Sequence, residues 1–175
     1  MPMSRYLARL RGQVGHELVM LPGVSACIFD EAGRVLLAHH VDSGIWALPG
    51  GAVEPDEDPA GAVAREAREE LGIAVTLQGL IGVYGGPEFR VSYPNGDLVS
   101  YVAIVYACRA AGTPVALDTS EVDEIRFVAD LDGLPAARWL PPVHADAVRW
   151  WQERSVAAPG NPAQRRVRAG RRERS

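Results

Sequence analysis

Three glutamates are spaced so that a helix would bring their carboxylates together. Glu66, Glu69 and Glu70 stand at i, i+3 and i+4 in a segment rich in alanine, and residues at this spacing share one helix face. Like charges so placed destabilise a helix by roughly a few tenths of a kcal/mol per pair, a penalty that a bound cation would remove. Carboxylate oxygens favour Mg²⁺ or Mn²⁺ over zinc. The three residues alone therefore predict either a site for such an ion or a solvated acidic face.

Further polar residues precede these glutamates at fixed distances. The segment from Gly51 to Ile73 reads GAVEPDEDPAGAVAREAREELGI, in which Glu57 follows Gly51 by six residues and Arg65 follows Glu57 by eight. The segment resembles the Nudix box, where a glycine, five residues, a glutamate and seven residues precede the run Arg-Glu-apolar-any-Glu-Glu-any-Gly-apolar. Every fixed polar and glycine position is present. The one departure is Ala67, where a larger aliphatic residue is usual.

The resemblance implies a hydrolase that cleaves a diphosphate linkage with the help of divalent metal ions. It makes Glu66 and Glu70 the principal metal ligands, and Glu69 either a further ligand or the base that deprotonates the attacking water. The carbonyl oxygen of Gly50 would complete the metal shell. Bound Mg²⁺ or Mn²⁺ would offset the negative charge of the substrate and lower the pKa of a bound water.

Other positions of the box have implied supporting roles. Arg65, which belongs with the glutamates to the implied catalytic set, would pair with Glu57 and fix the preceding loop against the helix. Gly51 and Gly72 would give structural support, and a glycine at position 72 is well suited to end the helix.

The box does not decide the general base, because in this family the base lies either in the box or on a later loop. Outside the box the candidates are Glu88, Glu121 and Glu124, of which the last two precede the strand-like segment 125–128. A solvated surface position is the alternative for each of them.

The rest of the substrate needs residues that can stack on a ring or bind a phosphate. In relatives the nucleoside part often lies against the region after the box, here 84–97, and His39 and His40 end a strand near the same cleft. The substrate candidates are Trp46, Tyr84, Phe89, Arg90 and Tyr93. Core packing is the alternative for Trp46.

Local signals predict two longer helices. Asp58 is a suitable N-cap and Pro59 fits the first helical position, so a helix should run from Pro59 to Leu71. A second amphipathic helix is predicted at 143–153. The tryptophans interpreted as docking this second helix are Trp139, Trp150 and Trp151.

The remaining elements are a short helix and several strands. The helix is predicted at 4–11, and the strands at 17–29, 34–40, 46–48, 74–84, 98–109 and 122–129. This order favours an α/β/α sandwich over a doubly wound parallel sheet. We expect a Nudix-type α/β/α sandwich with a mixed β-sheet, a central Nudix helix and a C-terminal helix.

Charge divides the chain into a predicted Nudix hydrolase domain at 1–154 and a tail at 155–175. The domain carries 12 arginines and 21 acidic residues, and an acidic body makes nucleic acid an improbable main partner. The tail has six arginines and one glutamate without periodicity, so it is expected to be disordered. A weak tether to nucleic acid or to an acidic partner is the alternative for the tail.

The expected setting is cytoplasmic. No apolar run is long enough to cross a bilayer, and charged residues occupy the place of a secretion signal's apolar core. Cys27 and Cys108 lie in apolar runs and are expected to be buried and free. A homodimer is common among relatives, although the sequence shows no interface signature.

Several functions fit the motif to different degrees. Hydrolysis of a nucleoside diphosphate derivative is favoured, either as an ADP-ribose or nucleotide-sugar pyrophosphatase or as a (d)NTP pyrophosphohydrolase. A non-catalytic nucleotide-sensing domain is disfavoured by the intact box. An isoprenoid-diphosphate isomerase would need a cysteine in the cleft, whereas both cysteines are expected within strands. The segment 84–97 is expected to set substrate choice.

Overall fold

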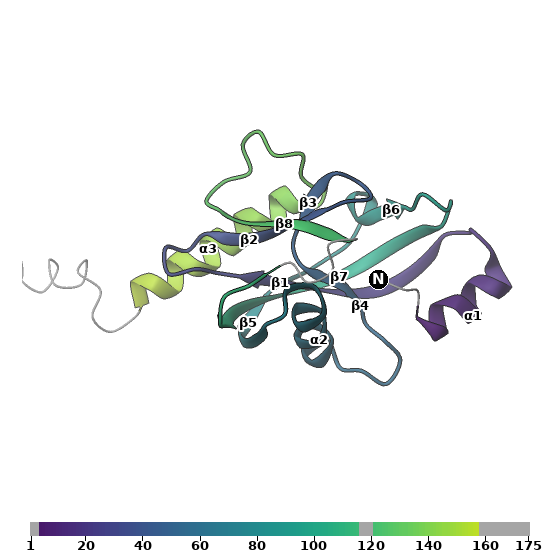
Figure 1. Ribbon diagram of the computed structural model, residues 1–175, viewed down its shortest axis with the longest axis horizontal. Helices are drawn as coiled ribbons and strands as arrows, with labels where there is room; N and C mark the ends of the chain where they lie inside the picture. Colours follow the sequence, from purple (N-terminus) through teal and green to yellow (C-terminus); the bar gives the residue numbers. More distant parts are fainter. Residues whose placement is uncertain (1–3, 116–120, 158–175) are drawn as a thin grey trace, which may run out of the picture.

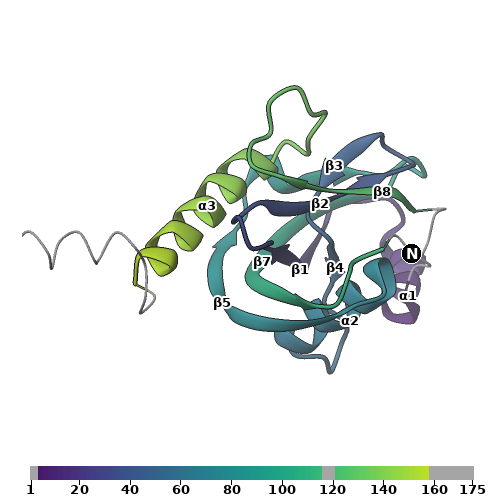
Figure 2. The same ribbon diagram turned by 60° about the vertical axis from the view of Figure 1, so that its left-hand side comes forward.

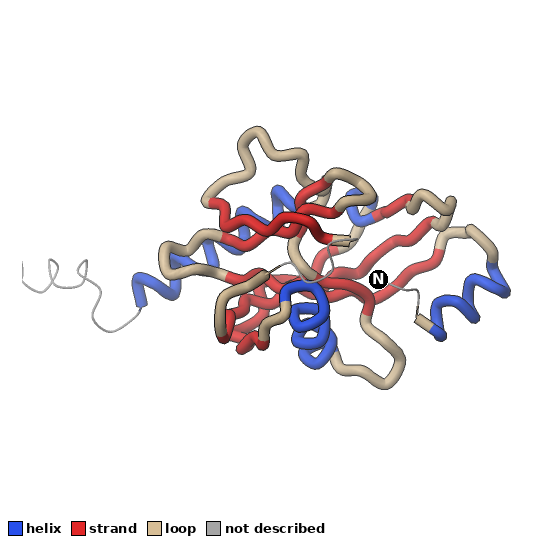
Figure 3. Tube along the Cα trace, viewed as in Figure 1, coloured by secondary structure: helices blue, strands red, loops and turns tan. Residues whose placement is uncertain are grey.

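Two β-sheets form the middle of the molecule, and the helices lie outside them (Figures 1 and 3). The computed structural model describes residues 4–115 and 121–157. Its elements in chain order are α1 (Arg5–Val14), β1 (Val19–Ile28), β2 (Val35–His40), β3 (Ile45–Ala47), β4 (Gly50–Ala52), α2 (Pro59–Leu71), β5 (Ala74–Tyr84), η1 (Pro87–Phe89), β6 (Arg90–Ser92), β7 (Leu98–Ala111), β8 (Val122–Val128) and α3 (Leu140–Ala157).

The larger sheet is mixed, as the sequence predicts. Its strand order is β4-β1-β7-β5, with β6 added beside β7. β1 and β7 run parallel from Val19↔Val99 to Ile28↔Cys108, whereas β4, β5 and β6 pair antiparallel with their neighbours. The smaller sheet, in the order β3-β2-β8, is antiparallel.

The two longer helices cover opposite faces of the larger sheet (Figure 2). Successive strand residues point to opposite faces, so Ile28 packs in a core cluster with α2, and Cys27 packs in another with α3. From α2 the first cluster takes Ala62, Val63 and Leu71. From α3 the second takes Leu140, Val143 and Ala147. The predicted α/β/α sandwich with a central and a C-terminal helix is therefore confirmed.

Helix α2 has the predicted bounds because its two ends are encoded locally. The Asp58 side chain accepts a hydrogen bond from the Gly61 N–H at 2.9 Å, which satisfies an otherwise unpaired helix donor. Gly72 ends the helix with φ of 65°, a left-handed conformation that glycine adopts without steric cost. Ala67, the position of the box where a larger aliphatic residue is usual, is fully buried on the inner face of this helix.

Other parts of the fold differ from the sequence-based expectation. Helix α3 begins at Leu140 rather than at 143, since Pro141 and Pro142 fall in the first turn, where a backbone N–H has no helical partner. It reaches Ala157 and so enters the predicted tail, whose remaining residues 158–175 lie outside the described part. The sequence also misses β4, β6 and η1.

Two smaller expectations concern the cysteines and the membrane. Cys27 and Cys108 are both buried and free of disulfides, which confirms the prediction for them. Among the described helices, none combines the length and the apolar composition that a membrane crossing requires.

Candidate active site

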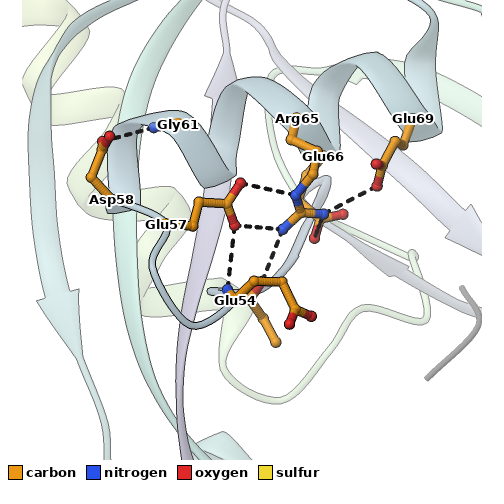
Figure 4. Close-up of polar contacts among 8 residues, drawn as sticks. Glu54, Glu57, Asp58, Gly61, Arg65, Glu66 and Glu69 are labelled. Carbon is orange, nitrogen blue, oxygen red and sulfur yellow. Dashed lines mark hydrogen bonds and ion pairs between the residues drawn. The ribbon is translucent and has the colours of Figure 1, made fainter. Parts of the chain in front are cut away.

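A bidentate ion pair joins helix α2 to the loop before it (Figure 4). Arg65 donates from Nε to Glu57 Oε1 and from Nη2 to Glu57 Oε2, both at 3.0 Å. Glu57 in turn accepts a hydrogen bond from the Glu54 N–H at 3.3 Å. Hydrogen bonding to the guanidinium lowers the pKa of Glu57, so its carboxylate stays ionised and holds the loop. This is the pairing that the Nudix resemblance implies.

Arg65 also organises the acidic face of the helix. It donates from Nη1 to Glu66 Oε1 at 2.8 Å and to Glu69 Oε2 at 3.1 Å, and from Nη2 to the Ala52 carbonyl at 3.1 Å. Its pKa is raised, first by hydrogen bonding to Glu57. One permanent cation is thus shared among three carboxylates and the backbone of β4.

Glu66 lies in an unusual position for a carboxylate. Its side chain is fully buried, and Oε2 has no hydrogen-bond partner. Burial raises its pKa, since an ionised group loses its hydration there. The Gly51 backbone approaches so closely that an added Cβ would meet the Glu66 carboxylate. A buried, half-satisfied carboxylate is costly unless something else binds its free oxygen.

Glu70 lies beside Glu66 and also faces β4. It is 7% exposed and accepts a hydrogen bond from the Gly50 N–H at 3.1 Å. Burial, followed by the nearby charge of Glu66, raises the pKa of Glu70 to about 8. Glu69 differs, since its side chain is 50% exposed and its carboxylate is held by Arg65.

These features fit a divalent cation. Two buried carboxylates of like charge face the glycine backbone of β4, and the free Glu66 Oε2 is an oxygen ligand without a partner. A hard cation would neutralise both charges and satisfy that oxygen. Within the described residues, no three His, Cys, Asp or Glu side chains are already grouped as a metal site. The Glu69 carboxylate accepts a hydrogen bond from Arg65.

A cavity of about 180 Å³ adjoins the same glycines. Gly50 and Gly51 line it, so the backbone that contacts the two buried glutamates also forms part of the cavity wall. The other lining residues are Gly23, Val24, Ser25, His40, Ala47, Leu48, Phe89, Val91, Tyr93, Tyr101, Ala103 and Trp139. Four aromatic rings and a histidine give this cavity ring faces and a polar edge, which suit a flat ring.

Only part of the expected substrate set lines this cavity. Phe89 and Tyr93 do so. Trp46 is 4% exposed. The Arg126 guanidinium lies over its indole ring, with Cζ 4.9 Å from the ring centre. The Tyr84 hydroxyl donates to Asp146 of α3 at 3.0 Å and so joins β5 to the C-terminal helix. Exposed Arg90, on β6, is also outside the lining.

Sequence reasoning missed two of the four aromatic residues of the cavity and left its histidine undecided. Trp139, interpreted from sequence as docking the C-terminal helix, lines the cavity and stacks on Phe89 with ring centres 5.8 Å apart. Tyr101 is the fourth residue of β7, and nothing in the sequence marks its face of the strand as functional. His40 was one of two adjacent candidates. Burial lowers the pKa of His40, which leaves a neutral imidazole able to donate and accept hydrogen bonds.

None of the three candidate bases outside the box is among the residues that line the cavity, and neither is Glu69. Glu124 is exposed on β8 and pairs with Arg126 at 2.7 Å, and Glu88 is exposed in η1. Glu121 comes just before β8, where its carbonyl accepts from the Val41 N–H at 3.0 Å.

Comparison with known proteins matches most of the described chain to one family. The family model for the NUDIX domain matches residues 20–158. A MutT-like protein of Streptomyces ambofaciens is 38% identical over 127 residues, which cover 63% of this chain and 76% of that protein. The ADP-ribose pyrophosphatase of Methanocaldococcus jannaschii is 32% identical over 106 residues, covering 58% of this chain. The chain spans less than two thirds of that enzyme, 61% of its length.

A solved structure agrees with the fold. The MutT NUDIX hydrolase from Burkholderia pseudomallei superposes with a TM-score of 0.58 at 31% identity. The match covers 75% of this chain and 97% of the Burkholderia chain. Helix α1, which begins at Arg5, precedes the residues that the family model matches.

Proposed function

The chain belongs to the NUDIX family, and from this premise we propose that it is a divalent-metal-dependent pyrophosphohydrolase acting on a nucleoside diphosphate derivative. The proposal is supported above all by Glu66, whose carboxylate is fully buried and has one oxygen without a hydrogen-bond partner. It lies against the glycine backbone that also walls an aromatic cavity. A charge in such a place is expensive, and metal binding is the function that explains it.

Glu66 and Glu70 are the proposed metal ligands, with Glu69 and the Gly50 carbonyl as further ligands. A bound Mg²⁺ or Mn²⁺ supplies charge neutralisation on the phosphate oxygens and a lowered pKa for an attacking water. Arg65 and Glu57 keep the helix and its loop in one arrangement, so that the two buried carboxylates stay opposite β4.

We propose Glu69 as the general base that accepts the proton of the attacking water. It is half exposed, so water reaches its carboxylate, unlike those of Glu66 and Glu70. Its partner Arg65 has three other acceptors in Glu57, Glu66 and the Ala52 carbonyl. Turning Glu69 away from Arg65 therefore leaves the guanidinium bound.

The cavity is proposed to hold the ring of the nucleoside. Its volume of about 180 Å³ is below the roughly 300–1,000 Å³ of pockets for drug-sized ligands, so it suits one ring system with the phosphates outside. Phe89 and Trp139 offer ring faces for stacking. The His40 imidazole and the Tyr93 and Tyr101 hydroxyls are the polar groups that can read the edge of a base.

A substrate panel tests this proposal. The protein is incubated with ADP-ribose, nucleotide sugars, nucleoside triphosphates, dinucleoside polyphosphates and coenzyme A, with Mg²⁺, with Mn²⁺ or with chelator, and release of phosphate or nucleoside monophosphate is measured. We expect turnover of at least one substrate that stops with chelator. Glu70→Gln should abolish it, while the exposed turn variant Glu31→Gln should not. Absence of turnover across the panel, or a fully active Glu70→Gln, would contradict the proposal.

A further inference from the structure

Helix α1 packs against one end of the larger sheet, although it lies before the residues matched by the family model (Figure 1). Ser4 caps it by accepting from the Leu7 N–H at 3.1 Å. Its apolar side joins a separate core cluster with β1 and β7, which also includes Tyr101. The helical members of the cluster are Leu7, Leu10 and Val14. Since Tyr101 also lines the cavity, α1 supports the back of a cavity wall.

Arg11 is the buried residue of this helix, 8% exposed. Its guanidinium donates to the carbonyls of Glu17 at 2.6 Å, Gly15 at 3.1 Å and Leu98 at 2.9 Å. Its Nε lies 3.5 Å from Asp97 Oδ2. Nη1 and Nη2 make the hydrogen bonds, whereas Nε makes none and faces the Asp97 carboxylate as an ion pair only. These partners join the end of α1 to the start of β7, and a buried charge needs such partners.

Asp97 in turn closes the turn of the β6–β7 hairpin. Its carbonyl accepts from the Tyr93 N–H at 2.9 Å. Its carboxylate receives the Asn95 side-chain amide at 3.0 Å and contacts His16 Nδ1 at 2.8 Å. The ionised carboxylate thus joins the turn, the segment that follows α1 and the helix itself.

The turn begins at Tyr93, which lines the cavity together with Tyr101. The two hydroxyls are 2.8 Å apart. The Tyr101 ring lies directly on the backbone of β1, where an added Cβ at Gly23 would come within 3.0 Å of it. One wall of the cavity therefore consists of two linked tyrosines, with α1 behind Tyr101 and the turn held by Asp97 beside Tyr93.

We propose that Arg11 is a positioning residue for substrate binding: by tying α1 to the turn before β7, it holds the Tyr93–Tyr101 wall of the cavity in place. This inference rests on the proposed function of the cavity. The partners of Arg11 lie at positions 15, 17, 97 and 98 rather than on α2. Its loss should therefore weaken nucleotide binding and leave the metal-dependent step intact.

The test compares Arg11→Gln with Arg9→Gln, which removes the same charge from an exposed position on the same helix. Kinetics are measured on the best substrate of the panel, and binding of the non-hydrolysable α,β-methylene ADP is measured by calorimetry. For Arg11→Gln we expect KM and the Kd of the analogue to rise roughly tenfold, which corresponds to about 1.4 kcal/mol, with kcat and Mn²⁺ affinity unchanged. Arg9→Gln should match wild type.

A double-mutant cycle checks the route of the effect. Tyr93→Phe removes the hydroxyl contact with Tyr101. The double mutant with Arg11→Gln should therefore raise the Kd by less than the product of the two single effects. If Arg11→Gln does not fold, Asp97→Asn takes its place in the cycle and should raise the Kd in the same way.

Three results would overturn the inference. The first is an unchanged Kd in both Arg11→Gln and Asp97→Asn. The second is a fall in kcat with KM unchanged. The third is a double mutant of Arg11→Gln and Tyr93→Phe in which the two effects on the Kd multiply fully. A wild-type protein that hydrolyses nothing in the panel would overturn the proposed function and this inference with it. Wild-type activity with normal binding by Arg11→Gln would overturn this inference alone.

Discussion

Replacing Gly51 by alanine tests how closely β4 must approach the buried carboxylate. The nearest heavy atoms to an added Cβ all belong to Glu66, with Cδ at 2.7 Å and Oε2 at 3.0 Å. Gly51 is not among the residues with positive φ, so alanine fits the backbone conformation there. The added methyl group therefore acts by displacing the Glu66 carboxylate.

The displacement sets the size of the effect. Overpacking of a buried site costs about 1–3 kcal/mol of stability, which a folded domain usually survives. A shift of about 1 Å in a group that positions the reacting atoms can lower the rate by roughly 100-fold. We therefore expect Gly51→Ala to lose about two orders of magnitude in kcat/KM while its cooperative unfolding transition is kept.

The assay measures kcat/KM with saturating Mg²⁺ and the unfolding free energy in parallel. Gly61→Ala is the matched control, because its added Cβ would lie 3.4 Å from Asp58 Oδ2, an ordinary contact, on the exposed side of α2. The control should keep its activity and gain up to about 1 kcal/mol from helix propensity. Wild-type kcat/KM in folded Gly51→Ala would refute the reasoning.

Three further changes have defined outcomes. Arg65→Lys should lower kcat/KM by roughly 10–100-fold at saturating metal, since an ammonium cannot match the bidentate contact with Glu57. A nearly unaffected rate would show that the contact is dispensable. Tyr84→Phe should lower the unfolding free energy by about 1 kcal/mol through the lost hydrogen bond to Asp146, and it should leave KM unchanged. A raised KM would instead show that Tyr84 contacts the substrate. The fold lowers the pKa of Asp97. Its ionised form therefore stabilises the protein at pH values above the usual aspartate pKa of about 4. This contribution is lost as the pH falls through the lowered pKa. The gap in Tm between wild type and Asp97→Asn should therefore close on acidification, and a gap independent of pH would contradict this.

The most predictable part of the structure is the part encoded by neighbours in the sequence. The N-cap Asp58, Pro59 and the C-terminal Gly72 fix helix α2 with local hydrogen bonds and φ preferences, so its bounds follow from the sequence. The contact between Glu57 and Arg65 follows from the motif in the same way.

The cavity was less predictable because its residues come from distant segments. Tyr101 and Trp139 belong to β7 and to the segment before α3, and only the tertiary fold brings them to one cavity. The three-residue strands β4 and β6 exist through pairing with β1 and β7, a long-range effect that local propensity does not report. The domain boundary at 154, the homodimer and the cytoplasmic setting stay predictions.

Binding of Mn²⁺ tests the central claim most directly, because it needs no knowledge of the substrate. Titration of the wild-type protein with Mn²⁺, followed by electron paramagnetic resonance, should show saturable binding. Glu66→Gln and Glu70→Gln should weaken it by at least roughly tenfold, since each removes a buried charged ligand, whereas Glu31→Gln should not. Mn²⁺ binding by folded Glu66→Gln and Glu70→Gln at wild-type affinity would contradict the assignment of the buried glutamates as the metal site.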